Sequence, residues 1–108
     1  MTQPQKTRRQ VLEDFLAANP NDAFARYGLA MECASVGDTA SAVEHYSKLI
    51  ASHPDYLPGY QMFGQLLASL ERKDEARKVF SAGIVVARKA GNLHAVSEME
   101  SAVQDLDR

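Results

Sequence analysis

The chain has 108 residues, of which 12 are basic and 14 acidic, and its formal net charge is -2. This length is that of one domain, so a single domain over residues 1–108 is expected. The near-balance of charge argues against nucleic acid or an acidic membrane surface as a partner, because either would require a basic excess on one face.

The cysteine content and the absence of long apolar runs favour a cytoplasmic protein. Cys33 is the single cysteine, so no internal disulfide can form, and its apolar neighbours indicate a small buried side chain. Residues 1–10 are polar and lack the apolar stretch of a secretory signal. No apolar run approaches the roughly 20 residues that a membrane span requires.

Helix-breaking residues divide the chain into segments of helical spacing, and no segment alternates like a strand. Pro20, Gly37, Pro54, the charged stretch 71–74 and Gly91 mark the boundaries. An all-α fold of about six helices is predicted, over 5–18, 22–36, 39–52, 56–70, 73–90 and 93–106. Four polar residues can cap the starts of these helices: Asn21, Asp38, Asp55 and Asn92. Gly37 and Gly91 can adopt the left-handed conformation that ends a helix.

A period of 34 residues runs through the middle of the chain. The corners around Pro20 and Pro54 match at this spacing. The same offset joins four further pairs: Leu29 with Phe63, Ala30 with Gly64, Ala42 with Ala76, and Tyr46 with Phe80. A fixed period with matched residue types indicates stacked repeats, and 34 residues is the length of one helix–turn–helix repeat.

The two copies match the repeat pattern W-x2-L-G-x2-Y, A-x3-F, P. The second copy reads Tyr60, Phe63, Gly64, Leu67, Ala76 and Phe80, and the first reads Arg26, Leu29, Ala30, Cys33, Ala42, Tyr46 and Pro54. The chain therefore resembles the tetratricopeptide repeat family, as a small bacterial-type protein with two full repeats plus flanking helices. The resemblance implies a right-handed α-solenoid of stacked antiparallel helix pairs. The departures are Arg26, Cys33, Leu67 and Arg88. The last replaces a proline, so the fifth helix is expected to run on for about one extra turn.

The resemblance divides the chain into four parts. Residues 5–20 resemble the second half of a repeat, 21–54 form repeat one, 55–90 form repeat two, and 91–108 form a capping helix. The last helix is alternatively the first helix of an incomplete third repeat, shifted by about two positions. Small residues are expected where the helices of each pair cross, at Ala30 and Ala42 and at Gly64 and Ala76.

The titratable residues do not converge on a catalytic or metal-binding pattern. His45, His53 and His94 lie in different segments, and none has the spacing of a zinc site. The glycines are dispersed, so no phosphate-binding loop is present. We therefore expect no enzyme, no cofactor and no metal.

The resemblance implies a concave groove lined by the first helix of each pair. Carried over by position, the groove residues are Phe24, Tyr27, Met31 and Ser35 from repeat one and Pro58, Gln61, Met62 and Gln65 from repeat two. The implied function is an adaptor that binds a peptide or helix of a protein partner in this groove. Two alternatives stay open. Phe24, Tyr27 and Met31 can simply cover the N-terminal helix, or the chain can be a self-associating structural or assembly module, a homo-oligomer without a peptide ligand.

Overall fold

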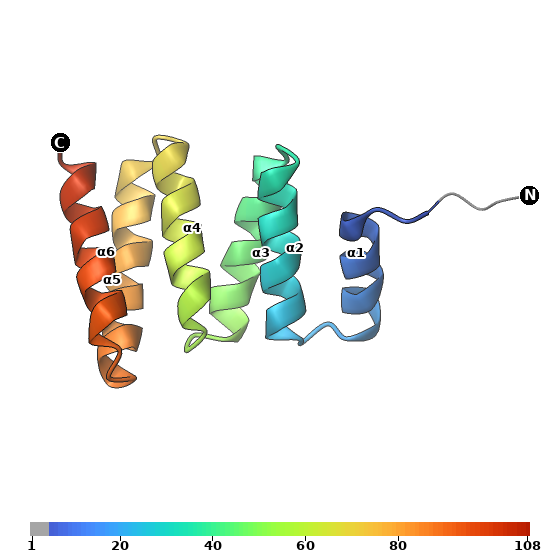
Figure 1. Cartoon of the computed structure of the whole chain (residues 1–108), viewed down its shortest axis with the longest axis horizontal. Coiled ribbons are helices and arrows are strands. Elements are labelled where there is room, and N and C mark those ends of the chain that lie inside the picture. Colours follow the sequence, from blue (N-terminus) through green and yellow to red (C-terminus); the bar gives the residue numbers. More distant parts are fainter. Residues whose placement is uncertain (1–4) are drawn as a thin grey trace, which may run out of the picture.

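The computed structural model describes residues 5–108, which form six α-helices and no strand. The helices are α1 Arg8–Ala18, α2 Ala23–Ser35, α3 Thr39–Ser52, α4 Leu57–Ser69, α5 Lys73–Lys89 and α6 Leu93–Leu106 (Figure 1). The predicted all-α class is confirmed, and each predicted helix boundary lies within three residues of the observed one. Residues 1–4, which the single-domain prediction includes, lie outside the described residues.

Two of the four predicted cap residues, Asp38 and Asn92, cap their helices with their side chains. Asp38 accepts a hydrogen bond from the backbone N–H of Ser41 at 3.1 Å, and Asn92 accepts one from Ala95 at 3.0 Å. Thr7 and Gln10 form a reciprocal capping box at the start of α1, which therefore begins later than residue 5.

Two predicted caps are wrong by one residue. Asp22, rather than Asn21, caps α2 by accepting from Ala25 N–H at 2.8 Å. Tyr56, rather than Asp55, holds the cap position of α4 and makes no side-chain cap hydrogen bond. Each proline corner contains one more residue than the sequence interpretation allowed, so the helix begins one position later.

Three tight turns share one geometry. Gly37, Glu71 and Gly91 have φ values of 84°, 60° and 72°, so each occupies the left-handed region. In each turn, the residue after the left-handed one donates its N–H to the carbonyl of the residue five positions earlier, at 2.9 Å. The predicted role of Gly37 and Gly91 is confirmed. The turns fold α2 against α3, α4 against α5, and α5 against α6.

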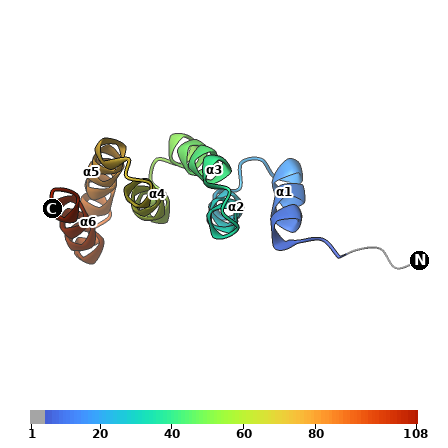
Figure 2. The ribbon, with the colours of Figure 1, turned by 90° about the horizontal axis from the view of Figure 1, so that it is seen from above.

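The remaining two connections are the proline corners, which end α1 and α3. The N–H of Asn19 donates to Phe15 O at 2.9 Å, and that of His53 donates to Leu49 O at 2.8 Å. Figure 2 shows the result as two layers, with α2, α4 and α6 in one and α3 and α5 in the other. The stack is elongated, with extents of 55 × 28 × 20 Å.

The core lies between the two layers and depends on small residues. Ala30, Ala42 and Ala76 are completely buried, as expected for helices that cross closely. A Cβ on Gly64 would lie 2.5 Å from the Phe80 ring, so only glycine permits this approach of α4 to α5. Tyr46 stacks on Phe63 with ring centroids 5.7 Å apart, and its burial raises its pKa to about 12.

Helix α5 has 17 residues and α3 has 14, which confirms the predicted extra turn. Arg88 lies in this extension, at the position where the earlier repeat has Pro54. Because arginine retains its backbone N–H, the helix continues where a proline would have ended it.

Candidate functional site

The predicted groove residues lie on α2 and α4, in the same layer of the stack. On α2, Phe24 is 75% exposed and Ser35 is also exposed. Tyr27 and Met31 are half-buried and pack against the core. The α2 set therefore combines an open aromatic ring with side chains that are anchored by packing.

The four α4 residues divide in the same way. Pro58 and Gln65 are exposed, whereas Gln61 and Met62 are half-buried. Met62 packs against the core. Pro58 is the second residue of α4, where its missing N–H leaves no helical hydrogen bond unmade, as predicted.

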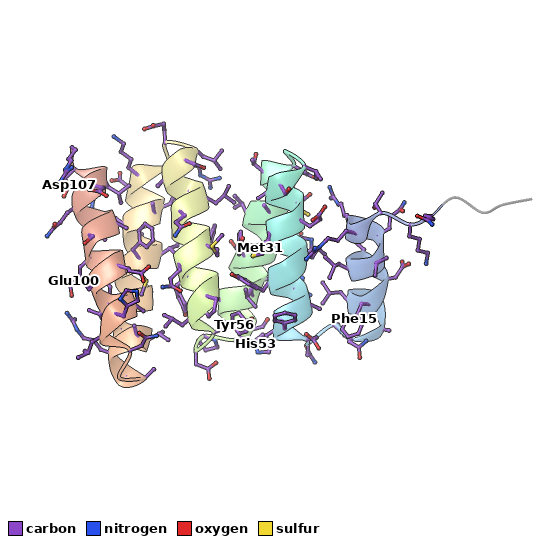
Figure 3. All side chains as sticks on the ribbon, viewed as in Figure 1. Phe15, Met31, His53, Tyr56, Glu100 and Asp107 are labelled. Carbon is purple, nitrogen blue, oxygen red and sulfur yellow. The ribbon has the colours of Figure 1, made fainter. Side chains whose placement is uncertain are left out.

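Tyr27 also links the two repeats. Its ring packs on that of Tyr56, with centroids 5.6 Å apart and planes tilted by 53°. Tyr56, labelled in Figure 3, holds the cap position immediately before α4. Burial, followed by the nearby Tyr27, raises the pKa of Tyr56. The sequence interpretation missed Tyr56, because it assigned the helix start to its neighbour Asp55.

An apolar hollow of about 360 Å³ opens between α1 and α2. It brings together three of the eight predicted residues, Phe24, Tyr27 and Met31, and adds Leu12 and Phe15 from α1. Figure 3 marks Phe15 and Met31 on the two helices. The hollow is completed by Arg8, Asp22, Ala25 and Gly28. Leu12 and Phe15 were recognised only as part of a half repeat, since the sequence does not reveal which face of α1 stays open.

The apolar surface around this hollow is incompletely covered. Phe15 is 47% exposed and Val11, on the same helix, is 53% exposed. Together with Phe24 they place three large apolar side chains in water near one end of the stack. Grouped apolar exposure of this kind is typical of an interaction surface.

A second hollow, of about 400 Å³, lies between α4, α5 and α6 and includes Gln65. Its other lining residues are Ala68, Glu71, Lys73, Phe80, Ala102, Asp105 and Leu106. It is more polar than the first, with acidic and basic side chains at its rim. These two hollows hold Phe24, Tyr27 and Met31 near one end of the molecule and Gln65 towards the other.

Ion pairs attach the start of α1 to the rest of the stack. Arg9 Nη2 lies 2.9 Å from Asp38 Oδ2, in the turn that joins α2 to α3. Arg8 Nε lies 3.6 Å from Glu32 Oε2 on α2. Hydrogen bonds from Ser41, and then the Arg9 guanidinium, lower the pKa of Asp38. These contacts position α1 as one wall of the hollow.

Reactive groups do not gather at this site. Cys33 is fully buried, which confirms its interpretation as a core residue, and burial raises the pKa of its thiol. Within residues 5–108, no group of three or more His, Cys, Asp or Glu side chains could hold a metal ion. In the same range, no helix is long and apolar enough to cross a membrane.

The fold matches several solved structures. The solution NMR structure of a tetratricopeptide repeat domain protein from Salinibacter ruber is 33% identical, covers 81% of this chain and 88% of its own, and has a TM-score of 0.76. A crystal structure of a tetratricopeptide repeat domain protein from the same organism is 32% identical, with coverages of 80% and 97% and a TM-score of 0.74. The solution structure of a Bordetella parapertussis protein shares the fold at 21% identity, with coverages of 96% and 90% and a TM-score of 0.80. No family model and no curated protein matches the sequence.

Proposed function

Because this chain belongs to the tetratricopeptide repeat family, we propose that it is a non-catalytic adaptor that binds a peptide or helix of another protein. In this proposal, residues 21–54 and 55–90 are the two complete repeats, flanked by a half repeat at 5–20 and a last helix at 91–108. The ligand lies on the layer formed by α2, α4 and α6.

The observation that carries this proposal is the open apolar hollow between α1 and α2. Leu12, Phe15, Tyr27 and Met31 provide an apolar floor and walls, and the exposed ring of Phe24 stands at its edge. Aromatic and methionine side chains adapt to varied apolar partners and are common at protein interfaces. The hollow suits one or two apolar side chains of an incoming helix or peptide.

The polar groups beside the hollow favour a ligand that binds in one orientation. Arg8 and Asp22 both line it, so it carries a cation and an anion. Further along the layer, the amides of Gln61 and Gln65 can pair with backbone groups of an extended ligand. An apolar anchor in the hollow followed by polar contacts on α4 would use five of the eight predicted groove residues: Phe24, Tyr27, Met31, Gln61 and Gln65.

Site-specific photo-crosslinking in cells tests this proposal. A photoreactive phenylalanine replaces Phe24 in one version and Val85 in another. Val85 lies on α5, is 51% exposed and does not line the hollow, so it is the matched control. Position 24 is expected to form a discrete adduct with another polypeptide, and position 85 is not.

The adduct must also depend on the apolar hollow. Phe15→Asp is expected to abolish the crosslink at position 24, because a carboxylate in an apolar contact remains desolvated and unpaired. The helical circular dichroism signal should stay unchanged. Equal crosslinking from positions 24 and 85 would show that the hollow has no specific partner. Retention of the adduct in Phe15→Asp would place the interaction outside the hollow.

We also propose a second candidate, a self-associating assembly module. It is favoured by one observation, the apolar exposure of Val11 and Phe15 at one end of the stack. Ends of a repeat stack that expose apolar surface are suited to contact with another copy.

A further inference from the structure

Helix α1 corresponds to the second helix of a pair whose first helix is missing from the described residues. The ends of α1 and α3 match residue by residue at an offset of 34: Asn19 and His53 are the C-caps, and each donates its N–H to the carbonyl four residues before it. By this register, Arg8 in α1 stands at the place of Ala42 in α3.

Helix α6 corresponds to the first helix of a pair whose second helix is not among the described residues. The caps that start α2, α4 and α6 are Asp22, Tyr56 and Asn92. Counting from these caps aligns the buried residues Ala25, Gly59 and Ala95, and likewise Leu29, Phe63 and Met99. The offset from α4 to α6 is 36, the shift of two positions predicted for an incomplete third repeat.

The two unpaired helices carry opposite charges at the crossing position. In the complete pairs this position holds small residues, Ala30 against Ala42 and Gly64 against Ala76. The same register places Glu100 on α6 and Arg8 on α1. Arg8 has 73% of its side chain exposed and Glu100 has 49%, so both are accessible to a further partner.

We propose that α6 of one copy docks beside α1 of a second copy in the order of a helix pair, with Glu100 against Arg8. These two long side chains hold the helices further apart at the crossing than the small residues of the complete pairs do. This inference rests on the second candidate function, self-association, and names α6 of a second copy of this chain as the occupant of the α1–α2 hollow. The helix enters at the end of the layer formed by α2, α4 and α6, next to α2.

A second pair of positions supports this register. Arg26 on α2 lies 3.1 Å from His45 on α3, which makes a polar contact within the complete pair of repeat one. The corresponding residues of the unpaired helices are Val96 on α6 and Val11 on α1. Both members of the contact are thus replaced together by apolar residues. Docking would cover Val11, which is 53% exposed, whereas Val96 is already buried at 7% exposure.

The ion pair at the centre replaces weaker local contacts. Arg8 Nε is 3.6 Å from Glu32, whose side chain is 22% exposed, and Glu100 is 3.1 Å from Arg88 on the molecular surface. Figure 3 shows Glu100 on the terminal helix of the stack. Since the two surfaces differ, the contact is head-to-tail, and copies add in a row unless the rotation between them closes a ring.

Analytical ultracentrifugation of the full chain up to about 1 mM tests the proposal by charge exchange. The wild type is expected to associate with rising concentration. Arg8→Glu and Glu100→Arg should each weaken association by about tenfold or more. The double variant Arg8→Glu, Glu100→Arg should restore it. Glu98→Arg is the matched control, because residues two apart point to different sides of a helix, and it should associate like the wild type.

Two results would overturn the inference: a wild type that stays monomeric throughout, or a double variant no better than the single ones. Far-ultraviolet circular dichroism confirms that each variant is folded, so loss of association is not mistaken for unfolding. The two proposals fail separately. A monomer whose position 24 crosslinks to another protein keeps the hollow as a binding site but excludes the second copy as its occupant. A chain that associates but gives no heterologous adduct loses the adaptor function.

Discussion

Arg26 and Tyr60, which stand 34 residues apart, donate hydrogen bonds to the carbonyls of equivalent prolines. Arg26 Nη2 lies 3.2 Å from Pro20 O, and Tyr60 Oη lies 2.7 Å from Pro54 O. Each bond ties a proline corner to the first turn and a half of the following helix. Arg26 stands where the repeat pattern has an aromatic residue. It makes the hydrogen bond to the proline corner that Tyr60 makes in the second repeat.

Removing either donor should lower the stability of the chain by weakening its proline corner. Tyr60→Phe deletes only the hydroxyl, and Arg26→Met keeps the apolar stem while deleting the guanidinium. Tyr60→Phe is expected to lower the free energy of unfolding by about 0.5–1.5 kcal/mol, the net value of a typical hydrogen bond. Arg26→Met should lower it by at least as much, because it also removes the 3.1 Å contact with His45. Urea denaturation measures both, and the double variant should lose the sum, because the two corners share no partner. A Tyr60→Phe midpoint equal to that of the wild type would show that the corner does not need the bond.

Two glycines within helices should respond to alanine in opposite directions. A Cβ on Gly64 would lie 2.5 Å from the Phe80 ring, so Gly64→Ala is expected to cost about 1–3 kcal/mol through overpacking. A Cβ on Gly28 would meet Leu12 at 3.7 Å, an ordinary contact. Gly28→Ala should therefore stabilise the chain by about 0.5–1 kcal/mol through helix propensity. Thermal melts of both variants test the close crossing of α4 and α5. Melting temperatures that shift in the same direction in both variants would contradict that crossing.

Glu71 stores backbone strain that glycine would relieve. Its φ of 60° is left-handed, and the two other turns of the same geometry hold glycine. Its exposed contact with Lys73 at 3.8 Å contributes little. Glu71→Gly is expected to raise the free energy of unfolding by about 0.5–1 kcal/mol. The reciprocal change Gly37→Ala, at φ 84° with no atom near its Cβ, should lower it by about 1 kcal/mol. Chemical denaturation of both compares the turns directly, and a destabilised Glu71→Gly would show a role for the carboxylate.

His45 should make the chain less stable as the pH falls below neutral. Burial, and then the neighbouring Arg26, lower the pKa of His45 below 6.5 in the folded state. As the pH falls from 6.5 towards this lower value, His45 binds a proton in the unfolded chain but not in the folded chain, so the free energy of unfolding decreases. The lowered pKa values of Asp38 and Glu44 act only below their ordinary values of 3.8 and 4.5.

Urea denaturation at about pH 7.5 and 5.5 isolates this effect from the carboxylates. The wild type is expected to unfold at lower urea concentration at the lower pH. His45→Gln should show a smaller difference between the two conditions. An undiminished difference in His45→Gln would assign the pH dependence to other groups.

The candidate site was predicted less completely than the helices. Phe24, Tyr27 and Met31 could be named from their places in the repeat pattern, and they do line one hollow. The pattern could not identify Phe15 as part of that hollow, because in a complete pair the same position is covered: Leu49, its counterpart in α3, is fully buried. Within residues 5–108 no first helix of a pair precedes α1, and Phe15 stays 47% exposed.

Local chemistry in the sequence determined the helices, their turns and the repeat period, because caps, left-handed glycines and close-packing alanines act over a few residues. Tertiary structure alone decided which apolar side chains stay open and which charges meet. Arg8 and Ala42 share one register position, yet the first lies on a helix that ends the stack and the second lies fully buried in its core. Burial depends on contacts with residues distant in the chain, and no local pattern records those contacts.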